Sequence, residues 1–97
     1  MRNREAEKMD RLVELVLRHT PLYYKMKEQL AIEAWEEVVG KMINSRTRRI
    51  WVKDGVLYLA FTSSVVRNEI AMIKESLIIK LNKKVGLNVI KDMVFVK

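Results

Sequence analysis

The sequence has no cysteine, and its 97 residues include only one histidine, one proline and three glycines. Without cysteine the chain has no disulfide framework and no thiolate ligands, and one histidine leaves too few soft ligands for structural zinc. The glycines are isolated from one another, so none starts a phosphate-binding loop of the GxGxxG or GxxxxGK[ST] type. We therefore expect no zinc and no cofactor.

The arrangements that support catalysis are also missing. No GxSxG motif surrounds Ser63 or Ser64, and no second histidine could act as the base of a triad. Glu36 and Glu37 are adjacent, but successive helix residues diverge by about 100°, so their carboxylates cannot converge on one substrate. We expect the protein not to be an enzyme.

Long apolar runs are absent too. The first ten residues, MRNREAEKMD, are charged where a signal peptide would have an apolar core. No segment approaches the roughly 18 apolar residues of a membrane span. These absences predict a cytoplasmic protein without a membrane partner.

What is present is the composition of one globular domain over residues 1–97, with 49% hydrophobic and 32% charged residues. Its charge is uneven. Residues 1–40 carry seven basic and eight acidic side chains (net −1), and residues 41–97 carry twelve basic and four acidic ones (net +8). This asymmetry favours an anionic partner, DNA or RNA. The alternative is a basic protein that binds no polyanion.

Two helices are predicted in the first part of the chain. Residues 3–18 have a stripe of apolar residues at helical spacing: Met9, Leu12, Val13, Val16 and Leu17. Thr20-Pro21 starts a second helix, since an N-cap oxygen precedes proline at the first helical position. That helix should end at Gly40, and a connection over Lys41–Ser45 should follow. Its expected buried row has a spacing of four: Leu22, Met26, Leu30, Ala34 and Val38. Tyr23, Trp35 and Val39 widen this row, so much of the helix circumference is expected to be core.

The stretch from Arg46 to Phe61 predicts a β-hairpin, because Asp54-Gly55 stands between two alternating apolar runs. A two-residue turn pairs Trp51 with Tyr58 and Arg48 with Phe61. One face is then core: Ile50, Val52, Leu57, Leu59 and Phe61. The other face is polar and aromatic: Arg49, Trp51, Lys53, Val56 and Tyr58.

This second face and the basic segment before it form a candidate nucleic-acid site. Its members are five cations and two aromatic residues: Lys41, Arg46, Arg48, Arg49, Lys53, Trp51 and Tyr58. In this interpretation the rings stack on bases and the cations contact phosphates. Equally, the ring pair could be a cross-strand contact that stabilises the sheet, or part of a subunit interface.

One more helix and one more strand complete the expected fold. Ser63 is the predicted N-cap of a single helix of about 22 residues, which Gly86 should end as a left-handed cap. Its expected buried stripe is Val66, Ile70, Ile73, Leu77, Leu81 and Val85. Residues 88–97 alternate as a strand does. Two pairs compete for its buried face: Met93 with Phe95, and Val94 with Val96.

The element order is helix, helix, strand, strand, helix, strand. It predicts an α+β domain whose three-stranded sheet has its helices packed on one face.

Several short motifs follow one another along residues 30–95: Trp35-Glu36-Glu37-Val38-Val39-Gly40, Thr47, Asp54-Gly55-Val56-Leu57, Ser63, Glu69-Ile70, Leu81-Asn82 and Gly86. In this order they resemble the bacterial DciA family. The resemblance implies a KH-like domain of DNA replication that binds the replicative helicase and assists its loading onto DNA. DNA binding is implied as a companion activity.

The chain departs from the family pattern in two places. Val66 stands where an aromatic residue is frequent, and Arg49 where a proline often follows the Thr47 position. The chain also ends directly after its last strand, so we expect it to lack the tail with which longer members make contacts. The segment Gly40-Lys41-Met42-Ile43 lacks the second glycine of a KH-type GxxG loop. We therefore expect non-specific phosphate contacts rather than clamping of a single strand.

Three functions compete on this sequence. The first is a replication accessory that binds helicase and DNA. The second is a general RNA- or DNA-binding module without a helicase partner. The third is a protein-interaction domain, for example a homodimer formed through the outer sheet face: Trp51, Tyr58, Val56, Val94 and Val96.

Overall fold

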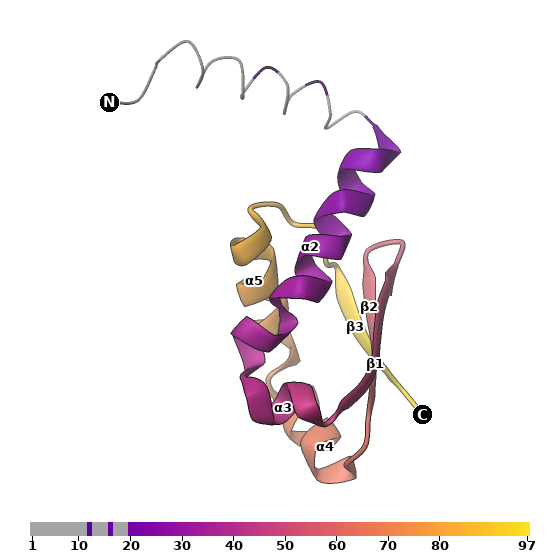
Figure 1. The fold of residues 1–97 in the computed structure, drawn as a ribbon, viewed down its shortest axis with the longest axis vertical. Helices are drawn as coiled ribbons and strands as arrows, with labels where there is room; N and C mark the ends of the chain where they lie inside the picture. The colour runs from indigo at the N-terminus through magenta and orange to yellow at the C-terminus, as the bar shows by residue number, and fades with distance from the viewer. Residues whose placement is uncertain (1–11, 13–15, 17–19) are drawn as a thin grey trace, which may run out of the picture.

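Helices and a three-stranded sheet form two layers (Figure 1), as predicted for an α+β domain. The computed structural model describes residue 12, residue 16 and residues 20–97. Its elements are α2 (Pro21–Val39), α3 (Lys41–Ser45), β1 (Thr47–Lys53), β2 (Val56–Phe61), α4 (Ser64–Met72), α5 (Lys74–Val85) and β3 (Asp92–Val96). The described helices all lie on one side of the sheet. None of them is long and apolar enough to cross a membrane.

Helix α2 begins and ends where the sequence predicts. The side chain of Thr20 accepts a hydrogen bond from the backbone N–H of Tyr23, and Pro21 occupies the first turn. Gly40 ends the helix with a φ of 92°, a conformation that favours glycine. The connection predicted after it is wrong, because Lys41–Ser45 forms the short helix α3.

The buried face of α2 is only partly the expected one, because the first three residues of the expected row are exposed. Leu22, Met26 and Leu30 are exposed by 71%, 46% and 40%. The buried residues are Ala34 of the expected row, Tyr23 and Trp35, which are expected to widen that row, and Ala31, which is not expected. Two alanines on this face allow close approach of the neighbouring layer, which the longer side chains of the expected row would prevent.

The predicted helix over residues 3–18 and His19 lie largely outside the described residues. Leu12 and Val16 are described, and both are helical. They are exposed by 61% and 68%, so the burial expected for these two is not observed.

The hairpin has the predicted register from Arg49 to the turn, with Trp51 opposite Tyr58. The predicted pairing of Arg48 with Phe61 is wrong, because the register shifts between Thr47 and Arg49 and Thr47 takes that place. Strict alternation would turn Arg48 towards the core. The bulge leaves Arg48 exposed and brings the Thr47 side chain to the inner face.

Strand β3 pairs with β2 in parallel, which gives the strand order β1-β2-β3. It settles the choice left open by the sequence: Met93 is 2% exposed and Phe95 packs against the core, whereas Val94 is 36% exposed. Asn82 fixes the approach to this strand. Its buried side chain donates to the Ile90 carbonyl and accepts from the Ile90 N–H, both at 2.8 Å.

The single long helix predicted after the hairpin is instead two helices, α4 and α5. Ser63 does cap α4 by accepting from the Val66 N–H, and Gly86 does end α5 in the left-handed region. The break falls at Ile73, which is 48% exposed rather than buried. A straight helix of 22 residues would be about 33 Å long, whereas a seven-residue strand spans about 23 Å. The break keeps both helices on the sheet.

Candidate nucleic-acid interface

The centre of the candidate interface is an aromatic pair on the outer face of the sheet. Trp51 and Tyr58 are directly opposite in the β1–β2 register. Their ring centroids are 5.2 Å apart and their planes are inclined by 8°, so the rings stack. The cross-strand contact that the sequence allowed is therefore present, and both side chains remain partly exposed.

Arg49 completes this pair from the same strand. Its guanidinium carbon lies 4.6 Å from the centroid of the Trp51 ring, within range of a cation–π interaction. The two residues are two positions apart on β1, which places their side chains on the same face. A base that stacked on this side of Trp51 would have to displace the guanidinium. The displaced Arg49 would then be free to meet a phosphate.

The third strand extends the row. Val94 pairs with Tyr58 in the parallel register, so Trp51, Tyr58 and Val94 cross the sheet in line. No described helix covers this face (Figure 1). It is consequently available to a planar or apolar ligand.

The predicted cations are distributed around the row rather than collected on it. Register places Arg49 and Lys53 on the outer face. Arg48 lies in the bulge, Arg46 is the C-cap of α3, and Lys41 begins that helix. All five are exposed, and they follow one another in the chain from α3 to the end of the edge strand β1.

An acidic residue limits the basic surface at the far edge. Asp92 begins β3 opposite Val56. The pKa of Asp92 lies below its usual value for two reasons. The main one is the hydrogen bond that its carboxylate accepts from the Met93 N–H, and the second is the Lys74 ammonium at 3.1 Å. An aspartate is ionised at neutral pH even at its ordinary pKa, and the negative charge of Asp92 on β3 favours an anionic ligand on the β1 side.

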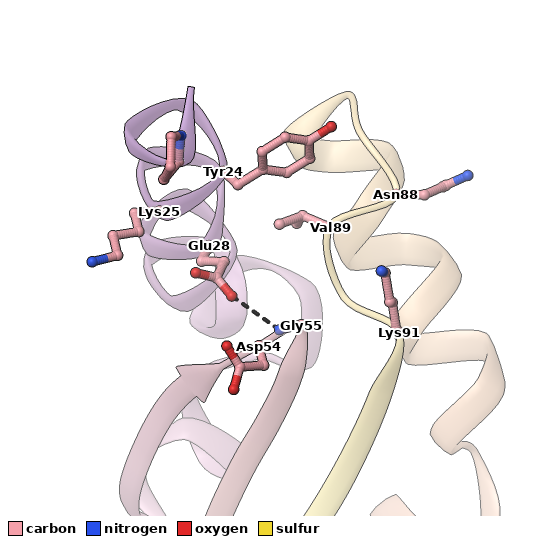
Figure 2. A pocket seen from close by; sticks show the side chains of 9 residues that line it. Tyr24, Lys25, Glu28, Asp54, Gly55, Asn88, Val89 and Lys91 are labelled. Carbon is pink, nitrogen blue, oxygen red and sulfur yellow. Dashed lines mark hydrogen bonds between the residues drawn. The ribbon is translucent and has the colours of Figure 1, made fainter. Parts of the chain in front are cut away.

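A pocket that the sequence analysis missed lies between α2, the hairpin turn and the loop before β3. In Figure 2 the Tyr24 ring extends from α2 towards the loop that carries Val89, and Glu28 points towards Gly55. The pocket has a volume of about 350 Å³. The Glu28 carboxylate accepts a hydrogen bond from the Gly55 N–H at 3.1 Å. Acidic and basic groups are mixed here, so the pocket has no clear preference for an anion. Of the residues that line this pocket, Gly55 stands out in the sequence, as part of the predicted turn.

Two acidic residues of α2 have structural partners. Glu36 accepts from the Asn44 side chain, and Glu37 pairs with Lys84. Among the described residues no group of three or more His, Cys, Asp or Glu side chains could hold a metal ion.

The described residues thus form a small α+β domain with an exposed aromatic and basic face of the sheet. The family model described as "Dna[CI] antecedent, DciA" matches residues 8–95, and the chain belongs to this family. No curated protein and no solved structure matches the chain. Membership suggests a role of the helicase-loader type in bacterial DNA replication, in a family of accessory proteins rather than known enzymes.

The residues that carry the family resemblance hold the fold together. Trp35 is 1% exposed and Leu81 is 0% exposed. Gly40 and Gly86 end helices, Asp54-Gly55 forms the hairpin turn with positive φ at both positions, Ser63 caps α4, and Asn82 fixes the loop before β3. The candidate interface lies on a different part of the chain's surface.

Proposed function

We propose that this protein is a non-enzymatic, cytoplasmic replication accessory that binds the replicative helicase and DNA and assists helicase loading. The family match is the observation that carries the helicase part of the proposal. The KH-like character that the resemblance implies belongs to the same proposal. In the described residues the helix and strand order agrees with it.

The outer sheet face is the proposed DNA surface. Arg46, Arg48, Arg49 and Lys53 contact phosphates, with Lys41 ahead of them in the chain. Tyr58 and Trp51 receive bases once Arg49 moves from the ring. Stacking of one base on an aromatic side chain is worth about 1 to 3 kcal/mol, more than the roughly 0.5 to 1 kcal/mol of an exposed cation–π contact, so the exchange is favourable.

Co-elution with the replicative helicase of the same organism tests the proposal. The two proteins are run together on a sizing column, with and without single-stranded DNA. A shared peak is the expected result. Separate peaks, with DNA still bound by this protein, would instead identify a general nucleic-acid-binding module.

A titration against RNA, single-stranded DNA and duplex DNA at two salt concentrations measures the phosphate contribution. Binding to duplex DNA through phosphates should weaken with a log-log slope of about −0.9 per contact. A salt-independent affinity would contradict the proposed surface.

Self-association through the outer sheet face is the second candidate function. The exposed Val94 beside the ring pair favours it, because an apolar row of this kind can be covered by a second copy. Trp51→Ala should then convert a dimer into a monomer, as measured by light scattering. An unchanged mass would reject the homodimer.

A further inference from the structure

Helix α2 has an apolar row that no described residue covers. Leu22, Met26 and Leu30 are exposed by 71%, 46% and 40% and follow one another at a spacing of four. On a helix this spacing makes a continuous ridge. The ridge borders the buried residues Tyr23 and Ala34, so the apolar surface of α2 extends from the core out to solvent.

The chain carries a second apolar stripe just before α2. Leu12 and Val16 are helical and exposed. In the sequence they belong with Met9, Val13 and Leu17, and these three also have a spacing of four. The sequence thus places a second apolar stripe of the same spacing directly before the exposed ridge of α2.

The two ridges are mirror images about the midpoint between residues 19 and 20. Reflection at this point places Leu17 opposite Leu22, and Val13 opposite Met26. Met9 falls opposite Leu30 in the same way. Antiparallel helices joined by a short loop bring such positions to the same level, because both rise by about 1.5 Å per residue.

The backbone between the ridges favours such a reversal. Thr20 is extended, with φ −111° and ψ 142°, so a continuous helix cannot pass through it. Pro21 maintains this conformation, because its ring disfavours a helical residue before it. The two to five residues that join antiparallel helices fit between Leu17 and Pro21.

We propose that the N-terminal segment, residues 3–18, docks as an antiparallel helix on the Leu22-Met26-Leu30 ridge of its own chain. The shortness of the connection favours the chain's own segment over that of a second copy. Docking would bury both ridges and add a helix on the edge of the helical layer.

Engineered disulfides test this proposal directly, because the chain has no cysteine of its own. Val13→Cys is combined with Met26→Cys, and the oxidised full-length protein is examined on a non-reducing gel and by mass spectrometry. We expect an intramolecular disulfide. The matched control is Val13→Cys with Lys25→Cys, which moves the second thiol by about 100° around α2. It should form the bond more slowly.

Each other outcome overturns the proposal. Disulfide-linked dimers would mean that a second copy occupies the ridge. Equal rates for the two pairs, or no bond in either, would mean that the segment does not dock there and that the ridge is open to another partner.

Hydrogen exchange gives an independent readout. Amides of residues 9–17 should be protected in the unmodified protein, and Met26→Lys should remove that protection while the amides of the sheet stay protected. Because Met26 is 46% exposed, this change leaves the described core intact. Absent protection in the unmodified protein would also overturn the proposal.

Discussion

The indole N–H of Trp35 donates a hydrogen bond to the hydroxyl of Thr47 at 3.0 Å, and that hydroxyl donates onward to the Ile43 carbonyl at 2.9 Å. Three elements, α2, β1 and α3, are joined by this one hydroxyl group. Trp35 is 1% exposed, so its N–H has no access to water and depends on Thr47.

We predict that Thr47→Val destabilises the protein by about 1 to 3 kcal/mol, because it leaves a buried donor without an acceptor. Urea unfolding followed by tryptophan fluorescence measures the change. Thr47→Ser is the matched control, since it keeps the hydroxyl and should lose less. Unchanged stability in Thr47→Val, or a smaller loss in it than in Thr47→Ser, would show that the hydrogen bond contributes little.

The turn at Gly55 supports a second prediction. Its φ is +80°, and a Cβ there would lie 3.3 Å from both the Val89 carbonyl oxygen and the Lys91 Cδ. Gly55→Ala should therefore add a steric cost to the backbone strain of about 1 to 3 kcal/mol.

Gly86→Ala provides the control for Gly55. Gly86 has a similar φ of +83°, but a Cβ there would meet nothing within 4 Å. The difference between the two thermal midpoints isolates the close approach of the hairpin turn to the loop before β3. If both variants melted at the same temperature, that approach would not contribute.

The ion pair at the start of β3 predicts a pH dependence. The folded-state pKa of Asp92 is lowered from 3.8, first by the Met93 N–H and then by Lys74. A lowered pKa means that the carboxylate stabilises the fold above its unfolded pKa, and that this contribution is lost as pH falls through the folded pKa. Asp92→Asn should lower the thermal midpoint at neutral pH and make no difference in strong acid.

Lys74→Met separates the two causes. Because the Met93 N–H is the larger cause, most of the pH dependence should remain in this variant. Loss of the whole pH dependence would assign it to the ion pair instead.

Features that one short segment determines were predictable from the sequence. The Asp54-Gly55 turn, the Thr20 and Ser63 caps and the Gly86 cap depend on side chains and φ values within a few residues. Which face of α2 is buried was not predictable in this way, because it depends on how closely α5 and the sheet approach the alanines.

The sequence contains one indication of the bulge in β1. The predicted register buried Arg48 against Phe61, and a lone arginine rarely occupies such a position. The position of the bulge depends on the hydrogen bond between Trp35 and Thr47, which joins separate elements and is not visible in the sequence. The same limit applies to the candidate site: register predicted the facing of Trp51 and Tyr58, but not the Arg49 guanidinium over the indole ring.

The position of Arg48 and Arg49 gives the last prediction. One is exposed in the bulge, and the other lies over the Trp51 ring on the outer face. If both contact phosphates, Arg48→Glu with Arg49→Glu should weaken DNA binding and flatten the log-log salt slope by about 2 on duplex DNA, roughly one unit per lost contact. Fluorescence anisotropy with labelled DNA measures both quantities.

A matched charge reversal separates a local contact from a general effect of net charge. Lys80→Glu with Lys83→Glu changes the charge by the same amount, but these exposed residues lie on α5, in the helical layer behind the sheet. We expect this variant to lose less affinity and to keep the salt slope, because long-range attraction is screened within about 10 Å at moderate salt. Equal losses in both variants would reject a localised site and leave only diffuse attraction by the basic chain. Unchanged affinity in the β1 variant, with the fold verified by circular dichroism, would remove the outer sheet face from the DNA surface.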